Sequence, residues 1–353
     1  MAHDSRREDY LRMSLRFALS LDGGDPAEAA REFASFGRRL ARDRDSLPQS
    51  DADRAFHLVS LATELVDYRL PFAGDALAET LVARGRSLLD EALSLDPGCH
   101  DAARMRFSLD TASPEERGRF LAERAGAVRG ACEAERDRLC ETLDEARRPL
   151  GANVAMRPWW RWLADQAECA LICGRNHEAV DAAERLLASD PHDLSDARFT
   201  LAYALAKLED EPALERLSAR YPALAAPRAD DDAWILLARI ALAHKAYRLA
   251  DARRLVERLL ASYPGCAAVL IRQMEIADGR FARIRVPAYG EDELIVAVSE
   301  GVVLLQEGME RTGKGVFGAW LARTVSELDP EAARAVAAAT GEKDGGAEGA
   351  IGR

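Results

Sequence analysis

The stretch from Arg157 to Tyr263 restricts the fold more than any other part of the sequence, because it carries one pattern twice. Each copy has an apolar helical segment, a short break, a second apolar helical segment and then a proline. The second segments end in ERLLASDP and ERLLASYP, with prolines at positions 191 and 264. Proline inside a helix removes a backbone hydrogen bond and clashes with the preceding turn, so each proline ends its helix. The pattern predicts a repeat of helical hairpins.

Composition favours helix along the whole chain. The 353 residues are rich in Ala, Leu, Arg and Glu, 48% of them are hydrophobic, and long β-branched runs are scarce. These residues have high helix propensity, and the length allows two or three domains. The net charge of -12 argues against general binding to nucleic acid or to an anionic membrane. We therefore expect an all-α protein with no nucleic-acid or membrane partner.

The N-terminal segment and the cysteines indicate a cytoplasmic protein. Residues 1–25 lack the uninterrupted apolar core of a secretory signal, and no stretch has the roughly 20 apolar residues that span a bilayer. The six cysteines are spread over the chain and lie mostly within helical patterns, as expected for buried free thiols in a reducing compartment.

The hairpins have the features of a tetratricopeptide repeat. That repeat is about 34 residues long and needs small residues where its two helices cross. With position 191 as the terminal proline, Gly174 falls at the turn, and Ala167 and Ala179 fall at the crossing. In the second copy Ala252 is the small residue. This predicts an α-solenoid, in which each hairpin buries its apolar face against the next.

The order of segments between Arg157 and Leu321 also resembles a family. RPWWRWLA, ERLLASDPHDLSDARFTLAYAL, AWILLARIAL and YGEDELIVAVSEGV resemble bacterial uncharacterised tetratricopeptide-like proteins. That family is related to proteins with a C-terminal SEC-C zinc motif and to the helical-repeat region of a eukaryotic tumour-suppressor-like family. The resemblance implies a partner-binding solenoid without known catalytic residues. The chain has no Cys cluster near its end, so we expect no zinc site there.

The sequence suggests four parts. Residues 1–150 form an N-terminal helical region, possibly with a degenerate hairpin that ends in EALSLDP before Pro97. Pro149 to Met156 is expected to be a linker, followed by the solenoid over 151–328 and a short helix over 329–340. The Gly-rich segment 341–353 is expected to be disordered.

We expect a non-enzymatic adaptor or scaffold that holds a protein or peptide partner, of unknown identity, in the concave groove of the solenoid. No catalytic, metal or cofactor set stands out. Arginines and Lys245 would donate to a carboxylate or an acidic peptide. For Arg198, pairing with Asp193 or Asp196 in its own turn is a specific alternative. The predicted partner-binding residues are Arg161, Glu168, Arg198, Trp234, His244 and Lys245.

The cluster RPWWRW gives a possible aromatic anchor at Trp159 and Trp162, which lie near one another on a helix face. Tryptophan is enriched both in cores and at interfaces, so the alternative is a core plug. The spacing of Cys169, Cys173 and His177 could gather zinc ligands. Gly174 turns the third ligand away, so buried thiols are favoured and no metal site is expected.

Two alternative functions are weighed. The segment Gly308–Gly315, GMERTGKG, is close to a phosphate-binding loop, but Gly315 stands where a hydroxyl must hold Mg²⁺. A helical pattern precedes it, whereas such a loop follows a strand. The second alternative is a homo-oligomeric scaffold built through the long helix expected over 113–148. Its apolar seam from Leu121 to Ala146 has coiled-coil spacing.

Overall fold

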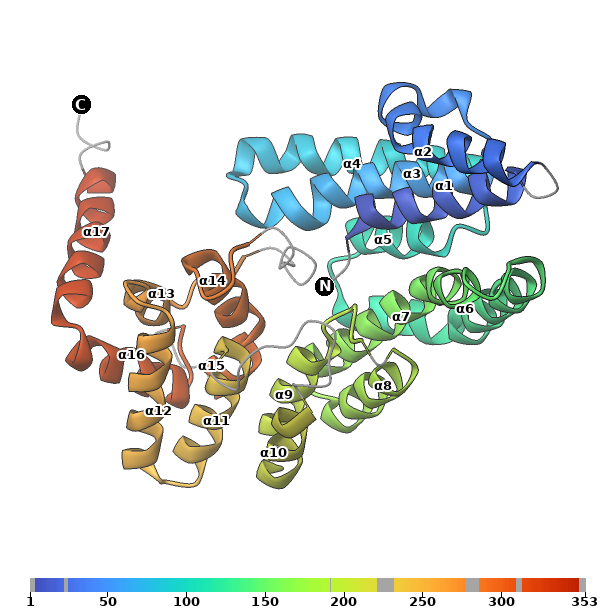
Figure 1. Ribbon diagram of the computed structural model, residues 1–353. Helices are drawn as coiled ribbons and strands as arrows, with labels where there is room; N and C mark the ends of the chain where they lie inside the picture. The colour runs from blue at the N-terminus through green and yellow to red at the C-terminus, as the bar shows by residue number, and fades with distance from the viewer. Residues whose placement is uncertain are drawn as a thin grey trace. The chain divides into compact units, whose positions relative to one another are not determined.

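The computed structural model contains only helices among the residues it describes, which are 4–21, 25–190, 192–220, 232–276, 286–308 and 313–348. The all-α prediction is confirmed over these ranges. They divide into two compact units, an N-terminal unit, His3–Cys169, and a C-terminal unit, Ala170–Arg353 (Figure 1). None of the described helices has both the length and the hydropathy that spanning a membrane requires.

The N-terminal unit is built on α3, which packs against α1, α4 and α5. Ser50 begins α3 with a capping box, since its hydroxyl accepts from the backbone of Asp53 and the Asp53 carboxylate accepts from the backbone of Ser50. The apolar faces of α3, α4 and α5 form one core cluster around Phe56 and Leu89. The helices of this unit are α1 (Ser5–Leu21), α2 (Pro26–Arg42), α3 (Asp51–Thr63), α4 (Asp75–Leu95), α5 (His100–Asp110) and α6 (Pro114–Thr142), with short helical turns η1 (Arg44–Ser46), η2 (Glu64–Arg69) and η3 (Leu70–Phe72).

The expected linker at Pro149 to Met156 is wrong, because these residues form the first turns of α7 (Arg148–Ile172). Proline in the first turn of a helix loses no hydrogen bond, so Pro149 starts this helix instead of interrupting it. The two units divide between Cys169 and Ala170. The expected domain boundary lay at residue 150.

The apolar seam of α6 is used inside the N-terminal unit. Leu121, Val128, Cys132 and Leu139 are buried. Leu139 belongs to a cluster that joins α1, α6 and α7, and the backbone carbonyl of Leu121 accepts a hydrogen bond from the Trp162 indole at 2.8 Å. The residues with coiled-coil spacing therefore pack α6 against other helices of its own unit.

In the C-terminal unit, helices that follow one another pack together. α9 contacts α8, α10 and α11, and α11 contacts α12 (Figure 1). The predicted helix ends at Ser189 and Ser262 are confirmed. The helices are α8 (Asn176–Ser189), α9 (Ala197–Lys207), α10 (Glu211–Arg220), α11 (Ala233–Lys245), α12 (Leu249–Ser262), α13 (Ala267–Arg272), α14 (Glu291–Glu300), α15 (Val302–Leu305), α16 (Val316–Leu328) and α17 (Pro330–Glu348).

Helices α9 and α11, which the repeat pattern predicts to line a groove, are covered by a later part of the same unit. α14 packs on α11, and α15 packs on α9. The Tyr203 hydroxyl donates to the carbonyl of Ala297 at 2.7 Å, and Lys207 donates to the carbonyl of Val303 at 3.2 Å. Together with α8, α10 and α11, this covering leaves every residue of α9 from Ala197 to Ala206 buried.

The Gly-rich end of the chain departs from expectation over part of its length. α17 continues to Glu348, into the segment 341–353 that composition predicts to be disordered. An Ala-rich run from Ala332 to Ala339 precedes this segment. Extending an existing helix costs far less than starting one, so the run carries the helix into weaker residues. Residues 349–353 lie outside the described residues.

Candidate ligand cleft in the N-terminal unit

A cleft in the N-terminal unit collects charged and apolar side chains from α1, α3, α5, α6 and α7. Its volume is about 350 Å³, and small-molecule sites typically have volumes of about 300–1,000 Å³. Three arginines reach it, Arg12 and Arg16 from α1 and Arg138 from α6. We call it the arginine cleft.

Arg12 and Arg16 are held in place by acceptors of their own unit. They lie four positions apart on α1, so they are neighbours on one helix face. Arg12 donates from Nε and Nη2 to Glu8 Oε1, at 3.1 and 2.9 Å, and its guanidinium lies 4.0 Å from the centre of the Phe56 ring. Arg16 donates from Nε to Asp53 at 3.0 Å. Both guanidinium groups are therefore oriented within the unit.

Arg138 approaches the cleft from α6. Its Nε and Nη2 donate to the two carboxylate oxygens of Glu135, at 2.7 and 2.6 Å, in a bidentate pair. The Arg138 side chain is 49% exposed. An exposed pair of this kind contributes at most about 1 kcal/mol to folding stability, so Arg138 can exchange its acceptor at little cost.

Glu8 connects Arg12 to a buried ion-pair network. The Glu8 carboxylate is buried, accepts from Arg161 Nη1 at 2.8 Å and lies 3.4 Å from Nη1 of Arg157. Arg161 in turn donates from Nε to Asp101 at 2.6 Å, and its Nη2 bonds the second oxygen of the same carboxylate. These pairs join α1, α5 and α7, and so fix the walls of the cleft relative to one another.

The buried carboxylates of this network stay ionised. Burial alone would raise the pKa of Asp101, but the positive charges of Arg161 and Arg104 outweigh burial and lower that pKa to about 2. For Glu8, burial again raises the pKa, while Arg161, Arg12 and Arg157 together bring it well below its usual value. The network is therefore fully charged at neutral pH.

Two cysteines line the arginine cleft, Cys99 and Cys132. Burial raises the pKa of the Cys99 thiol to about 12 and that of Cys132 to about 11. Only the thiolate is a good nucleophile, so both side chains are inert at neutral pH. The cleft is therefore equipped for binding through its arginines and has no activated thiol.

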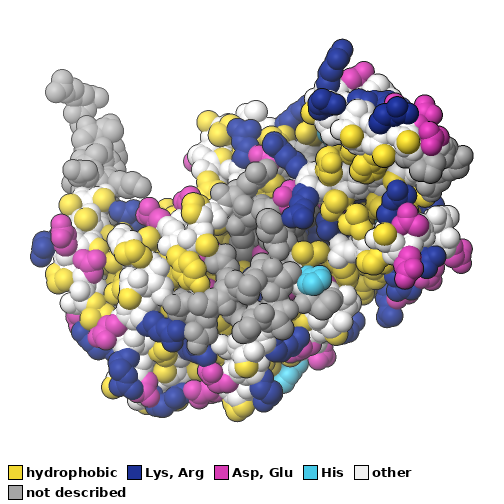
Figure 2. Space-filling model, in the orientation of Figure 1, with side chains coloured by type: hydrophobic (Ala, Val, Ile, Leu, Met, Phe, Trp, Pro, Cys, Tyr) yellow, Lys and Arg dark blue, Asp and Glu magenta, His cyan; other side chains and the backbone are white. Residues whose placement is uncertain are grey.

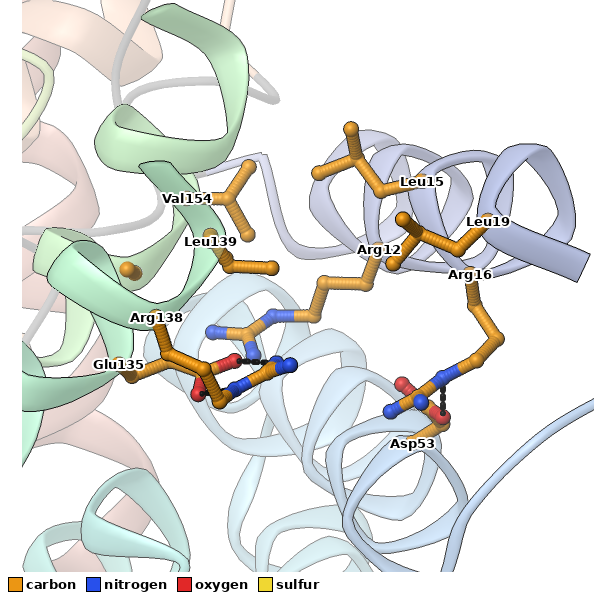
Figure 3. A pocket seen from close by; sticks show the side chains of 10 residues that line it. Arg12, Leu15, Arg16, Leu19, Asp53, Glu135, Arg138, Leu139 and Val154 are labelled. Atoms are coloured by element: carbon orange, nitrogen blue, oxygen red, sulfur yellow. Dashed lines mark hydrogen bonds and ion pairs between the residues drawn. The ribbon is translucent and has the colours of Figure 1, made fainter. Parts of the chain in front are cut away.

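A smaller apolar pocket opens beside the arginines. Its volume is about 60 Å³, and it shares Arg12, Arg16 and Arg138 with the cleft. Leu15, Leu19, Leu139 and Val154 supply its apolar walls. Figure 3 shows Arg12 reaching from α1 toward Glu135 and Arg138 of α6, with the leucines on either side. Charged donors and an apolar recess thus meet at one place.

The arginine cleft is electrically mixed. Arg12 pairs with Glu8, Arg16 with Asp53 and Arg138 with Glu135. The same mixture extends over the surface, since Figure 2 shows basic and acidic side chains next to one another over its visible face. The cleft therefore does not present the single-sign field that draws in a polyanion.

Three of the predicted partner-binding residues lie in the interior. Arg161 is 2% exposed and pairs with Glu8 and Asp101 in the N-terminal unit. Arg198 is 1% exposed in the C-terminal unit. The alternative for Arg198 is confirmed, because its Nη1 lies 2.6 Å from Asp193 and 3.1 Å from Asp196. These contacts place both arginines in internal ion pairs rather than on a surface that a partner can reach.

Trp234 is fully buried at the start of α11. Its indole N–H donates to Glu300 at 2.7 Å, and its ring stacks on Phe199 with centroids 4.0 Å apart. The repeat pattern predicts that this side chain lies on a groove open to a partner, whereas the structure buries it. The inner face meets the chain's own α14, so the position predicted for a partner is filled.

The remaining predicted groove residues are less enclosed. Glu168 and His244 are half-buried. The His244 ring lies 5.0 Å from that of Trp320, and burial lowers its pKa. Lys245 lies 3.0 Å from Glu307 and 3.6 Å from Glu209. Partner binding by these residues stays a prediction.

The possible aromatic anchor lies inside the N-terminal unit. Trp159 and Trp162 are both buried in the N-terminal unit, which is the setting of the core-plug alternative.

In the loop Gly308–Gly315, residues 309–312 lie outside the described residues. Helix α15 precedes the loop, and Lys314 donates to the backbone carbonyl of Ile271 at 2.6 Å.

The residues weighed as zinc ligands, Cys169, Cys173 and His177, lie at the end of α7 and just after it. Cys169 is buried, Cys173 is half-buried and His177 is exposed. Gly174 has a φ of +73°, in the left-handed region that commonly ends helices. Within the described ranges, no group of three or more His, Cys, Asp or Glu side chains could hold a metal ion.

The arginines of the cleft were missed by the sequence reasoning. Arg12 and Arg16 have helical spacing on an amphipathic segment, which ordinarily indicates a solvated face. The sequence does place Asp53 three residues after a capping serine, but it does not show that this carboxylate also accepts from Arg16. No spacing rule connects α1 with Arg138.

No family model matches this chain, and no curated protein sequence matches it. The function therefore has to be inferred from the geometry of the two units.

Proposed function

We propose that this protein is a non-enzymatic helical adaptor that holds a peptide or protein partner, and that the partner contacts the arginine cleft. The C-terminal hairpins are interpreted as tetratricopeptide-like repeats that form a scaffold. The observation that carries the proposal is the cleft itself, a space of about 350 Å³ that three oriented arginines reach. Arginine forks bind carboxylates with defined geometry, so an acidic side chain of a partner fits this place.

The location in the N-terminal unit is supported by the state of the alternative surface. The inward face of α9 and α11 is packed against α14 and α15, and Trp234 is fully buried there. A partner at that face would have to displace buried residues such as Leu294 and Val298. The arginine cleft requires no such displacement.

The absence of enzymatic activity is supported by the chemistry of the cleft lining. The Cys99 and Cys132 thiols are protonated at neutral pH because burial raises the pKa of each. Of the carboxylates that line the arginine cleft, Asp101 and Glu135 are both occupied in arginine pairs. These groups orient donors and do not form a nucleophile with an adjacent base.

The test is affinity capture from native lysate with the full-length chain. The Arg16→Gln/Arg138→Gln double variant should lose a partner that the wild type retains. Arg129→Gln is the matched control, because Arg129 lies on the same helix as Arg138 and pairs with Glu133, but does not line the cleft. It should retain the partner.

A third variant separates the two surfaces. Lys245→Gln alters a predicted groove residue of the C-terminal unit whose side chain is 20% exposed. The proposal expects this variant to behave as wild type. Loss of the partner from Lys245→Gln, with retention by the double variant, would move the binding site to the C-terminal unit.

A further inference from the structure

The arginine cleft and the small apolar pocket share a wall, and that wall limits the chemistry of the ligand. Arg12, Arg16, Glu135, Arg138 and Ala155 line both cavities. On one side of these arginines lies the larger cleft, and on the other lies a recess of about 60 Å³ lined by leucines and Val154. A ligand bound at the arginines therefore has apolar surface within reach.

Each cleft arginine uses two of its three nitrogens internally. Nε and Nη2 of Arg12 bond Glu8, those of Arg16 bond Asp53 and Ser50, and those of Arg138 bond Glu135. The third nitrogen, Nη1, makes no hydrogen bond to any described residue in these three side chains. Three oriented Nη1 groups, each with two N–H donors, thus remain for an outside acceptor, and little conformational freedom is lost when one binds.

The charge balance of the cleft favours an acceptor that carries a single negative charge. Each guanidinium already has a carboxylate partner, so the arginines do not present three uncompensated charges. A polyphosphate would meet Asp53 and Glu135 at close range, whereas a single carboxylate accepts hydrogen bonds through two oxygens and adds one charge. Inorganic phosphate would leave the leucine-lined recess unused.

We infer that the shared wall is a subsite for a carboxylate joined to a short branched apolar group. The carboxylate accepts hydrogen bonds from Arg12 and Arg16, Arg138 exchanges Glu135 for the same ligand, and the apolar group enters the recess between Leu15 and Leu139 (Figure 3). The inference rests on the proposed function, since it names the chemistry that the partner brings to the cleft. Two sources carry this chemistry, a free organic acid and an acidic side chain beside an apolar one in a protein.

The experiment measures binding of defined probes to the full-length chain by isothermal titration calorimetry at low salt. The probes are 4-methylpentanoate, its uncharged amide, acetate, inorganic phosphate and the blocked peptide acetyl-Leu-Glu-Leu-amide. We expect 4-methylpentanoate to bind at least ten-fold more tightly than its amide and than acetate. Tighter binding of the peptide than of the free acid assigns a protein source, and the reverse order assigns a small molecule.

Two variants locate the binding. Arg16→Gln and Arg138→Gln should each weaken 4-methylpentanoate at least ten-fold, while Arg129→Gln should leave it unchanged. Arg138 is exposed and paired within its own helix, so its variant keeps the fold and tests the site even if Arg16→Gln unfolds. Equal binding of acid and amide, preference for phosphate, or equal binding by all variants would overturn the inference. Failure of every probe would overturn it too, but would leave the adaptor proposal standing if the cleft variant still loses its partner in the capture experiment.

Discussion

The indole N–H of Trp234 donates a hydrogen bond to Glu300, with 2.7 Å between Nε1 and Oε2. Trp234 lies at the start of α11 and Glu300 at the end of α14, so the bond joins two helices whose residues are 66 positions apart. The same ring stacks on Phe199 of α9. Three helices of the C-terminal unit thus meet at one side chain.

Removing the acceptor of this bond should destabilise the C-terminal unit. Glu300→Ala leaves a buried donor without its charged acceptor, and such losses cost about 1–3 kcal/mol. We expect a lower midpoint of urea unfolding. Glu327→Ala is the control, because Glu327 is 56% exposed in its pair with Arg253. Equal free energies of unfolding for the two variants would contradict a structural role for the Trp234 bond.

Truncating Arg161 should have a larger effect on the N-terminal unit. Arg161→Met leaves Glu8 and Asp101 buried with much of their countercharge removed, and breaking a buried pair in this way costs about 3–5 kcal/mol. Arg129→Met removes an exposed pair and should cost at most about 1 kcal/mol. Chemical denaturation of both variants measures the difference. A cost for Arg161→Met below that of Arg129→Met would show that the network does not stabilise the unit.

The same network should make the fold sensitive to acid. The folded pKa of Asp101 is about 2 and that of Glu8 is also lowered, so both groups bind fewer protons in the folded state. Their stabilisation is present above the unfolded carboxyl pKa values and is lost as pH falls through the folded ones. For Asp101 it amounts to about 2 kcal/mol. We expect the free energy of unfolding to fall between about pH 4 and pH 2, and to fall less steeply in Asp101→Asn. Identical slopes would contradict the assignment.

Alkylation should distinguish three of the four cysteines of the N-terminal unit. Cys99 and Cys132 are buried with raised pKa values, whereas Cys140 is half-buried near the C-terminal end of α6. In native protein at neutral pH, iodoacetamide should modify Cys140 at least about ten-fold faster than the other two, because rate follows thiolate content and access. Peptide mass spectrometry measures this order. Rapid modification of Cys99 or Cys132 would show that the cleft holds an activated thiol.

Local features of the fold were predictable because their causes lie close together in sequence. Ser189 and Ser262 end their helices two positions before the prolines at 191 and 264 in the sequence. Arg198 pairs with Asp193 and Asp196 within a few positions of the chain. Such features follow from helix stop signals and short-range charge pairing, which one sequence displays directly.

The placement of Arg161 was not predictable in the same way. Its partner Glu8 is 153 positions away, and no spacing rule in the sequence connects the two residues. The repeat pattern predicts Trp234 on a groove open to a partner. It does not predict that α14 and α15 cover α11 and α9, because the apolar pattern of a helix does not specify which neighbour it packs against.

The role of Pro149 was ambiguous for a different reason. Proline ends a helix when it lies inside one and begins a helix when it lies in the first turn, so position decides its meaning. Asp144 accepts from the backbone of Arg147 at 2.9 Å and sets the start of α7 just before the proline. The ring then fits the first turn of that helix.

Glu8 is shared between a residue at the cleft and two residues of the interior. It pairs with Arg12, which lines the cleft, and also with Arg157 and Arg161, which belong to α7. A ligand that draws on Arg12 must therefore alter the field around groups that hold the helices together. Ligand binding at the cleft and the free energy of unfolding are therefore thermodynamically linked. We therefore expect the ligand inferred for the cleft to raise the melting temperature of the chain.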